Sequence, residues 1–168
     1  MAMDIKNKKI LFADLDGTLI RTVSGKTFPE DVTDFRIRKE VLDAIQRMPN
    51  LLCIAIVTNQ GGIPQYVKEH EFQGKLGAIR VFTQLYMQKP VAAVYCDSMD
   101  KTNPNRKPNT GMLYTALEYL SPAYQFNKAD MLMIGDASGK EGQFSDSDKK
   151  TAENFGIDYL DVDDFVEL

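Results

Sequence analysis

The 168-residue chain contains no tryptophan, one histidine and two cysteines, and none of its apolar runs approaches 18 residues. Cys53 and Cys96 both lie in apolar, strand-like runs, so they indicate buried thiols in a reducing compartment and exclude a disulfide framework. The short apolar runs exclude a membrane-spanning helix. Residues 1–9 carry no apolar signal-peptide core, and we therefore expect a cytoplasmic protein with no membrane partner.

The chain also lacks a strong charge of either sign, because 20 lysine and arginine residues oppose 24 aspartate and glutamate residues. A net charge of −4 argues against tight non-specific binding of nucleic acid by the whole surface, but it is compatible with a local basic groove. No long linker, internal repeat or low-complexity stretch divides the sequence. We therefore expect residues 1–168 to form a single domain, of an oligomeric state that the sequence leaves open.

Apolar runs alternate with helical patterns along the chain. Strands are expected at residues 9–13, 51–57, 91–95, 131–134 and 157–160. Helices are expected at residues 37–48, 67–88, 111–120 and 148–155, with a last helical turn within 161–168. Gly74 and Gly77 are expected to bend or split the second helix. Apolar strands that alternate with helices predict an α/β fold with a parallel sheet covered on both faces, which is a three-layer α/β/α arrangement.

The first strand runs directly into two carboxylates and a glycine, Asp14, Asp16 and Gly17. Side chains two residues apart on a strand point the same way, so Asp14 and Asp16 project together from the end of the strand where open α/β sheets bind ligands. Gly17 lets the backbone turn sharply and approach a ligand closely. Two carboxylates this close repel each other, and a hard cation relieves that repulsion.

Two further strand ends carry groups that bind phosphate. Thr58 and Asn59, followed closely by two glycines, offer a hydroxyl, an amide and free backbone N–H groups to phosphate oxygens. Lys107, preceded by Arg106, offers a point charge suited to a phosphoryl group. From these positions we predict that Gly17, Thr18, Asn59 and Arg106 contact the substrate.

The last strand end is acidic. Asp136 directly follows the run 131–135, and Asp146 and Asp148 lie at the start of the next helix. Each of these acids alone is common in a turn or at a helix start. Four strand ends that carry the required residue types in one order, however, predict phosphoryl transfer, in which a carboxylate takes the phosphoryl group and passes it to water.

This order resembles the haloacid dehalogenase-like phosphatase superfamily, whose motifs are an Asp-x-Asp, a Thr or Ser, a Lys and a terminal acid pair. The resemblance implies a Rossmann-like fold, with Asp14 as the nucleophile and Asp16 as the general acid and base. Thr58 and Lys107 would bind the phosphoryl group. It also implies Mg²⁺ as the cofactor, held by Asp14, the Asp16 carbonyl and Asp136, with Asp148 as a supporting acid and Asp146 as the alternative.

A narrower resemblance covers nearly the whole chain. Residues 12–20, 24–29, 34–35, 58–60, 106–112 and 134–139 are similar to the phosphatase domain of the polynucleotide kinase 3′-phosphatases. That resemblance implies removal of 3′-phosphates from nucleic-acid ends, a DNA-repair setting, and a separate polynucleotide kinase or repair proteins as partners. Residues 24–27 are not a P-loop, because Ile20 stands where the leading glycine is required, so we expect only the phosphatase half.

The spacing of the motifs leaves no room for a lid. The segments from Thr18 to Thr58 and from Thr58 to Lys107 are each largely used by one helix and its neighbouring strand or loop. We therefore expect a capless, open site that a polymer end can enter. A local basic rim with stacking rings is expected from Arg21, Lys26, Arg36, Arg38 and Arg106, with Phe28 and Phe35.

Other interpretations stay open at this point. Acidic residues interleave with the basic rim, so one alternative is that the rim is ordinary surface charge. The alternative substrate is then a small phosphate ester of the sugar phosphate or histidinol phosphate type. The zinc loop that related histidinol- and heptose-phosphate phosphatases can carry is not expected, because residues 97–105 hold neither cysteine nor histidine. A third interpretation is a catalytically idle module that binds a phosphorylated end or a protein.

Overall fold

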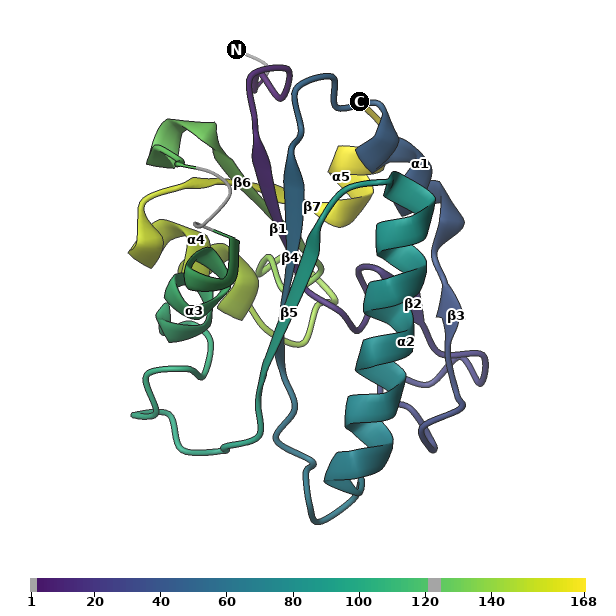
Figure 1. Cartoon of the computed structure of the whole chain (residues 1–168). Coiled ribbons are helices and arrows are strands. Elements are labelled where there is room, and N and C mark those ends of the chain that lie inside the picture. The colour runs from purple at the N-terminus through teal and green to yellow at the C-terminus, as the bar shows by residue number, and fades with distance from the viewer. Residues whose placement is uncertain (1–2, 121–124) are drawn as a thin grey trace.

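The computed structural model describes residues 3–120 and 125–168. Its centre is a five-stranded sheet in the order β5-β4-β1-β6-β7, with every neighbouring pair parallel (Figure 1). The strands are β1 (Ile10–Ala13), β4 (Cys53–Asn59), β5 (Val91–Cys96), β6 (Met131–Gly135) and β7 (Asp158–Asp161). Because β1 is central and pairs with both β4 and β6, the residues that follow it lie between two other strand ends.

Helices cover both faces of this sheet. One face packs against α1 (Lys39–Gln46), α2 (Glu69–Met87) and α5 (Val162–Val166), and the other against α3 (Gly111–Leu120) and α4 (Ser147–Phe155). Along β1, Leu11 and Ala13 enter the first core while Ile10 and Phe12 enter the second, because successive side chains of a strand point to opposite faces. The three-layer α/β/α prediction is therefore confirmed.

A short 3₁₀ helix, η1 (Lys128–Asp130), precedes β6. None of the described helices combines the length and the apolar character needed to cross a bilayer.

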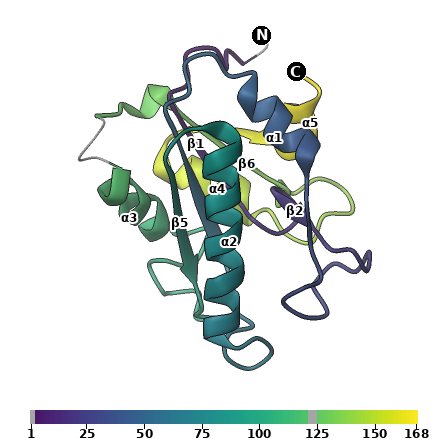
Figure 2. The ribbon, with the colours of Figure 1, turned by 45° about the vertical axis from the view of Figure 1, so that its right-hand side comes forward.

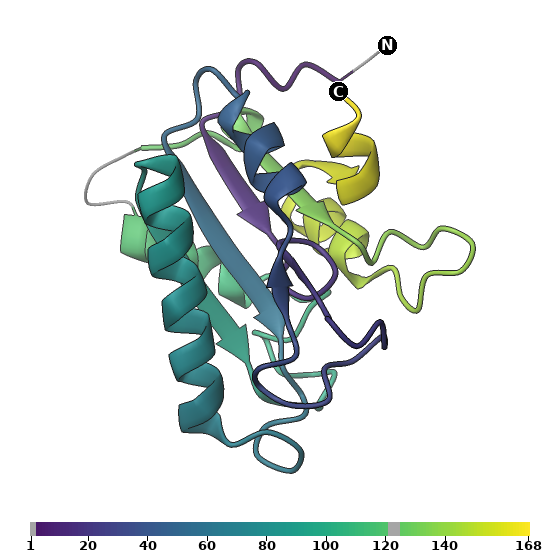
Figure 3. The same cartoon turned by 90° about the vertical axis from the view of Figure 1, so that its right-hand side faces the viewer.

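A small second sheet was not predicted from the sequence. β2 (Ile20–Arg21) and β3 (Arg36–Ile37) pair in an antiparallel manner, and the loop between them extends beside the loop that follows β6 (Figure 3). Strands of two residues have no detectable periodicity, so the sequence could not reveal them. In the described part of the chain nothing larger is inserted after β1, and the fold is capless.

Three expectations about individual elements were wrong. The first predicted helix begins at Lys39 because Ile37 belongs to β3. Thr58 and Asn59 are the last residues of β4 and do not follow it. Helix α2 is neither bent nor split at its two glycines, because buried side chains anchor it on both sides of them, which outweighs the roughly 1 kcal/mol that a helical glycine costs relative to alanine. These anchoring residues are Phe72, Leu76, Ile79 and Thr83.

Candidate active site

Asp14, the predicted nucleophile, is buried at the end of β1. Its backbone N–H donates to the Ile134 carbonyl at 3.2 Å, which ties the start of the following loop to β6. Its carboxylate accepts a hydrogen bond from Lys107 Nζ at 2.8 Å and a long one from Thr18 Oγ1 at 3.4 Å. The lysine contact is therefore the stronger of the two.

Lys107 lies between two carboxylates. Its Nζ is 2.8 Å from Asp14 Oδ1 and 2.6 Å from Asp148 Oδ1, and its side chain is only 3% exposed. Burial alone would lower the pKa of Lys107, but the charges of Asp14 and Asp148 outweigh burial and raise this pKa. The lysine is therefore a permanent cation beside the predicted nucleophile.

Three acids converge at this point. Asp14, Asp136 and Asp148 each place one carboxylate oxygen within 4.8 Å of the others. Burial, and then the negative charges of Asp14 and Asp148, raise the pKa of Asp136 above that of an ordinary aspartate. Burial, and then Asp14, likewise raise the pKa of Asp148 against the opposing effect of Lys107.

Asp136 Oδ1 is buried and has no hydrogen-bond partner among the described residues. An unpartnered buried carboxylate oxygen within a cluster of three carboxylates is the oxygen-rich, electronegative environment that a hard cation such as Mg²⁺ occupies. The residues present therefore fit a divalent cation. We refer to Asp14, Asp136, Asp148 and Lys107 as the acid cluster.

Two glycines permit this crowding. Gly17 has φ of +78°, and a Cβ there would lie 1.9 Å from Asp136 Oδ2. A Cβ at Gly135 would lie 2.3 Å from Asp148 Oδ2. Any side chain at either position would displace a carboxylate of the acid cluster. Glycine is therefore required at both positions, because the carboxylates approach the backbone closely there.

Of the two acids that start α4, the structure brings only Asp148 into the cluster. Asp148 lies inside the first turn of the helix, and its Oδ2 accepts the Ala137 backbone N–H at 3.1 Å. The side chain of Asp146 is 47% exposed and pairs with Lys150 at 3.0 Å. Asp146 is therefore not a member of the acid cluster.

Asp16, the predicted acid and base, is joined to Thr58 by a residue that the sequence did not single out. Gln60 Nε2 donates to Asp16 Oδ2 at 2.8 Å and lies 3.0 Å from Thr58 Oγ1. Gln60 thus holds the predicted proton-transfer group and a predicted phosphoryl-binding hydroxyl together. A glutamine does not by itself indicate a functional role, and the only clue in the sequence is that Gln60 directly follows Thr58 and Asn59.

Two predicted substrate contacts have other partners. Asn59 donates from Nδ2 to the Lys107 carbonyl at 3.1 Å and accepts the Lys107 backbone N–H at 2.9 Å, so it holds that lysine in place. Arg106 Nη1 donates to the Ser98 carbonyl at 2.9 Å. Arg106 does not line the pocket beside the acid cluster.

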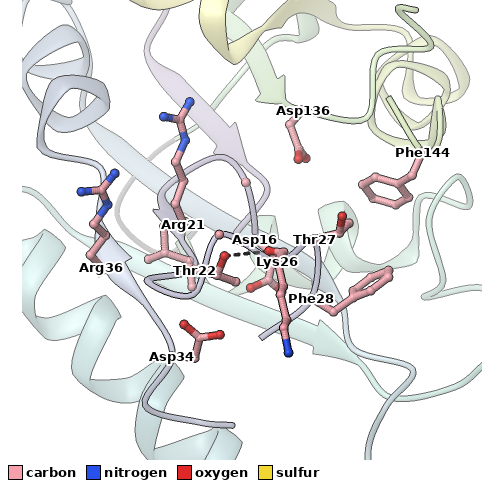
Figure 4. Close-up of a pocket in the computed structure, with 13 residues that line it drawn as sticks. Asp16, Arg21, Thr22, Lys26, Thr27, Phe28, Asp34, Arg36, Asp136 and Phe144 are labelled. Atoms are coloured by element: carbon pink, nitrogen blue, oxygen red, sulfur yellow. Dashed lines mark hydrogen bonds between the residues drawn. The ribbon is translucent and has the colours of Figure 1, made fainter. Parts of the chain in front are cut away.

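This pocket has a volume of about 360 Å³, and Asp16, Gly17 and Asp136 form part of its wall (Figure 4). The rings of Phe28 and Phe144 form another part and meet edge to face, with centroids 6.2 Å apart. Both rings are well exposed, at 69% and 65%. Three cations complete a surface that we call the aromatic rim, which consists of Phe28, Phe144, Arg21, Lys26 and Arg36.

The rim differs from the one expected. Arg38 is buried, where it donates to the Gly17 carbonyl at 2.9 Å and to Asp163 at 3.1 Å. Phe35 packs against the core, with Lys75 Nζ 5.0 Å from its ring centroid. The second exposed ring is supplied by Phe144, which is too far along the chain from Phe28 for the sequence to link them.

Asp34 gives the loop that carries Phe28 its shape. Its carboxylate accepts hydrogen bonds from Ser24 N at 2.8 Å, Ser24 Oγ at 2.6 Å and Glu30 N at 2.9 Å. These bonds, that of the Ser24 hydroxyl first, lower the pKa of Asp34 to about 2. The loop is therefore fastened by a carboxylate that is ionised at neutral pH.

The fold is that of the haloacid dehalogenase-like phosphatases. Among solved structures, the fold is similar to D,D-heptose 1,7-bisphosphate phosphatase of B. bronchiseptica, which was crystallised with magnesium and phosphate. The TM-score is 0.67 at 17% identity, over 90% of this chain and 78% of that one. A Mesorhizobium loti protein identified only as a HAD-like phosphatase gives a TM-score of 0.64 at 24% identity, over 89% and 69% of the two chains.

The chain belongs to the polynucleotide kinase 3 phosphatase family, whose family model matches residues 9–166. A relative is the bifunctional polynucleotide phosphatase/kinase of Schizosaccharomyces pombe, which is 33% identical over 163 residues. The match includes 95% of this chain but 38% of the relative. The chain therefore spans less than half the length of that bifunctional protein.

Proposed function

We propose that the chain is a Mg²⁺-dependent phosphomonoesterase that removes 3′-phosphates from nucleic-acid ends. The observation that carries this proposal is the shared wall of the pocket, since Asp16 and Asp136 line the same hollow as the aromatic rim. Exposed rings beside cations are the surface on which single-stranded nucleic acids stack their bases and neutralise their phosphates. A sugar phosphate has no base to stack on these rings.

The chemistry follows from the positions of Asp14 and Asp16. A carboxylate oxygen of Asp14 attacks phosphorus, the bond from phosphorus to the 3′ oxygen breaks, and Asp16 gives its proton to that oxygen. Water then attacks the aspartyl-phosphate, Asp16 takes one of its protons, and inorganic phosphate leaves with the Asp14 carboxylate restored. Lys107 and Thr58 supply positive charge and a hydroxyl beside the transferred group.

The residues that would hold Mg²⁺ are Asp14, Asp136 and the carbonyl of Asp16, with Asp148 as support. When bound, the cation would neutralise charge on the phosphoryl oxygens and let the carboxylates stay ionised close together. Without it, the raised pKa of Asp136 favours a protonated acid in the cluster.

The cellular setting of this proposal is the repair of nucleic-acid ends in the cytoplasm, with a polynucleotide kinase or repair proteins as partners. Both cysteines are buried and unpaired, which supports a reducing compartment. A hydroxyl at the 3′ end is the product that a strand-extending or strand-joining step requires.

The decisive experiment is a phosphate-release panel in Mg²⁺ with matched substrates. The panel contains DNA and RNA oligonucleotides with a 3′-phosphate or a 5′-phosphate, mononucleotides, sugar phosphates, histidinol phosphate and an aryl phosphate. Asp14→Asn serves as the background, so that any contaminating phosphatase is subtracted. We expect the oligonucleotide 3′-phosphate to have the highest kcat/KM.

Each other ranking has a defined meaning. A higher kcat/KM for a sugar phosphate or histidinol phosphate would overturn the nucleic-acid substrate and leave the phosphatase chemistry intact. Equal rates on 3′- and 5′-phosphorylated oligonucleotides would overturn the choice of end. Release from no substrate at all, including the aryl phosphate, would support the idle binding module.

A further inference from the structure

Helix α2 lies on the outside of the molecule (Figure 2), and its outward face is apolar where a solvent-exposed helix is normally charged. Val81, Phe82 and Leu85 are all exposed, and Leu85 reaches 71%. Between Glu71 and Lys89 the only charged residues are Lys75 and Arg80. Lys75 is buried, and Arg80 turns aside to donate to the Val91 carbonyl at 3.5 Å.

Glycines extend this face toward the start of the helix. A Cβ added at Gly74 or Gly77 would meet no atom within 4 Å, so nothing in the described fold requires a glycine at either position. Glycine is a poorer helix former than alanine, and here it gives the described fold no packing in return. What the two glycines do provide is a shallow depression on the helix surface, into which a neighbouring side chain could pack.

Small and large residues on this face are arranged symmetrically. Three small residues precede the peptide bond between residues 79 and 80, and three large apolar residues follow it at matching distances along the chain. The small residues are Gly74, Gly77 and Ala78, and the large ones are Val81, Phe82 and Leu85. If a second copy of α2 packed antiparallel across a two-fold axis at that point, every large side chain would face a small one. Facing residues must also lie on the same side of the helix face, so the pairs would be Gly74 with Leu85, Gly77 with Val81, and Ala78 with Phe82.

The charges at the two ends of the helix agree with the same arrangement. Glu71 is exposed in the first turn of α2, and Lys89 follows its last residue. An antiparallel two-fold places the first turn of one copy beside the end of the other, so Glu71 of each copy would lie next to Lys89 of its partner. The complementary charges and the complementary shapes point to the same occupant, which is a second copy of this chain.

We propose that α2 is the interface of a symmetric homodimer, with the two helices packed antiparallel about their midpoints. None of the residues that line the catalytic pocket belongs to α2, so both pockets stay open in the dimer. The proposal is independent of the substrate. It is tested by oligomeric state and not by activity.

The first test measures the mass of the full chain by sedimentation equilibrium over a concentration series. We expect a monomer–dimer equilibrium, in which Leu85→Glu raises the dissociation constant by about a hundredfold because each dimer buries two copies of this leucine. Tyr119→Glu is the matched control, since Tyr119 is an equally exposed apolar side chain on α3, and its dissociation constant should equal that of the wild type. A wild-type chain that is monomeric throughout the series, or equal effects of the two variants, would overturn the proposal.

The second test addresses the orientation of the helices. Glu71→Lys and Lys89→Glu should each weaken the dimer by placing like charges together, and the double variant should regain wild-type affinity. Thermal unfolding of each variant, together with hydrolysis of an aryl phosphate, checks that fold and site are unchanged. Failure of the double variant to recover the dimer would rule out the antiparallel arrangement.

Discussion

The acid cluster and the aromatic rim meet at one pocket, where Asp136 of the cluster lines the wall, but they are built in opposite ways. Three members of the cluster follow strands β1 and β6 or lie in the first turn of α4, and Lys107 comes from the loop before α3. All but the half-buried Asp136 are buried, and Lys107 links Asp14 to Asp148. The rim sits on two-residue strands and on loops, and its rings are mostly exposed. In the proposed function, the sheet therefore positions most of the groups that react, while loops present the groups that select the substrate.

This difference teaches which changes should affect every substrate and which should affect only some. If the proposed function holds, a group in the cluster acts on the phosphoryl group, which all phosphomonoesters share. A group in the rim would then act on the part of the substrate that differs between a nucleic-acid end and a small ester. Comparing an oligonucleotide 3′-phosphate with an aryl phosphate separates the two regions experimentally.

The largest effect is expected from Asp14→Asn. The amide has nearly the shape of the carboxylate but cannot act as the nucleophile, so kcat should fall by about 10⁴-fold or more on both substrates. Steady-state kinetics measure the loss, and circular dichroism checks that the fold is retained. Turnover near the wild-type rate would contradict the proposed mechanism.

A smaller loss is expected from Asp148→Asn, again on both substrates. Asp148 Oδ1 lies 2.6 Å from Lys107 Nζ, and its oxygens reach the other acids of the cluster. Loss of its charge should weaken Mg²⁺ about ten- to a hundredfold, measured as the Mg²⁺ concentration that gives half-maximal rate. Asp146→Asn, two residues away and exposed, is the matched control and should behave as wild type; equal effects of the two substitutions would remove Asp148 from the metal site.

The rim variants should separate the substrates. Phe28→Ala and Phe144→Ala should each lower kcat/KM for the oligonucleotide about tenfold, which corresponds to the loss of one stacked base, and leave the aryl phosphate unchanged. Tyr119→Ala, an exposed aromatic outside the pocket, is the control. Equal losses on both substrates would show that the rings support the fold of the site and do not bind the polymer.

The smallest effect concerns pH and the loop fastened by Asp34. The pKa of Asp34 is lowered to about 2 in the folded protein from an ordinary value of 3.8. Its stabilising contribution is therefore complete above about pH 4 and is lost as pH falls through 2. Asp34→Asn should lower the melting temperature at neutral pH and flatten the dependence of this temperature on pH between about 4 and 2; an unchanged slope would mean that the carboxylate does not fasten the loop.

The sequence by itself determined the order of the layers and the site of the chemistry. Strands that are apolar throughout specify a buried parallel sheet, and the carboxyl ends of parallel strands meet at one edge. Asp14, Lys107 and Asp136 could therefore be placed near one another without coordinates. Their roles in catalysis remain predictions of the chemistry.

Only the tertiary structure decided which groups surround that site. It selected Asp148 over Asp146, put Gln60 between Asp16 and Thr58, buried Arg38, and paired Phe28 with Phe144 in place of Phe35. Each of these outcomes depends on how loops from distant parts of the chain pack against one another. Local patterns of hydrophobicity carry no information about such packing, because side chains in irregular segments follow neither the strand period nor the helix period.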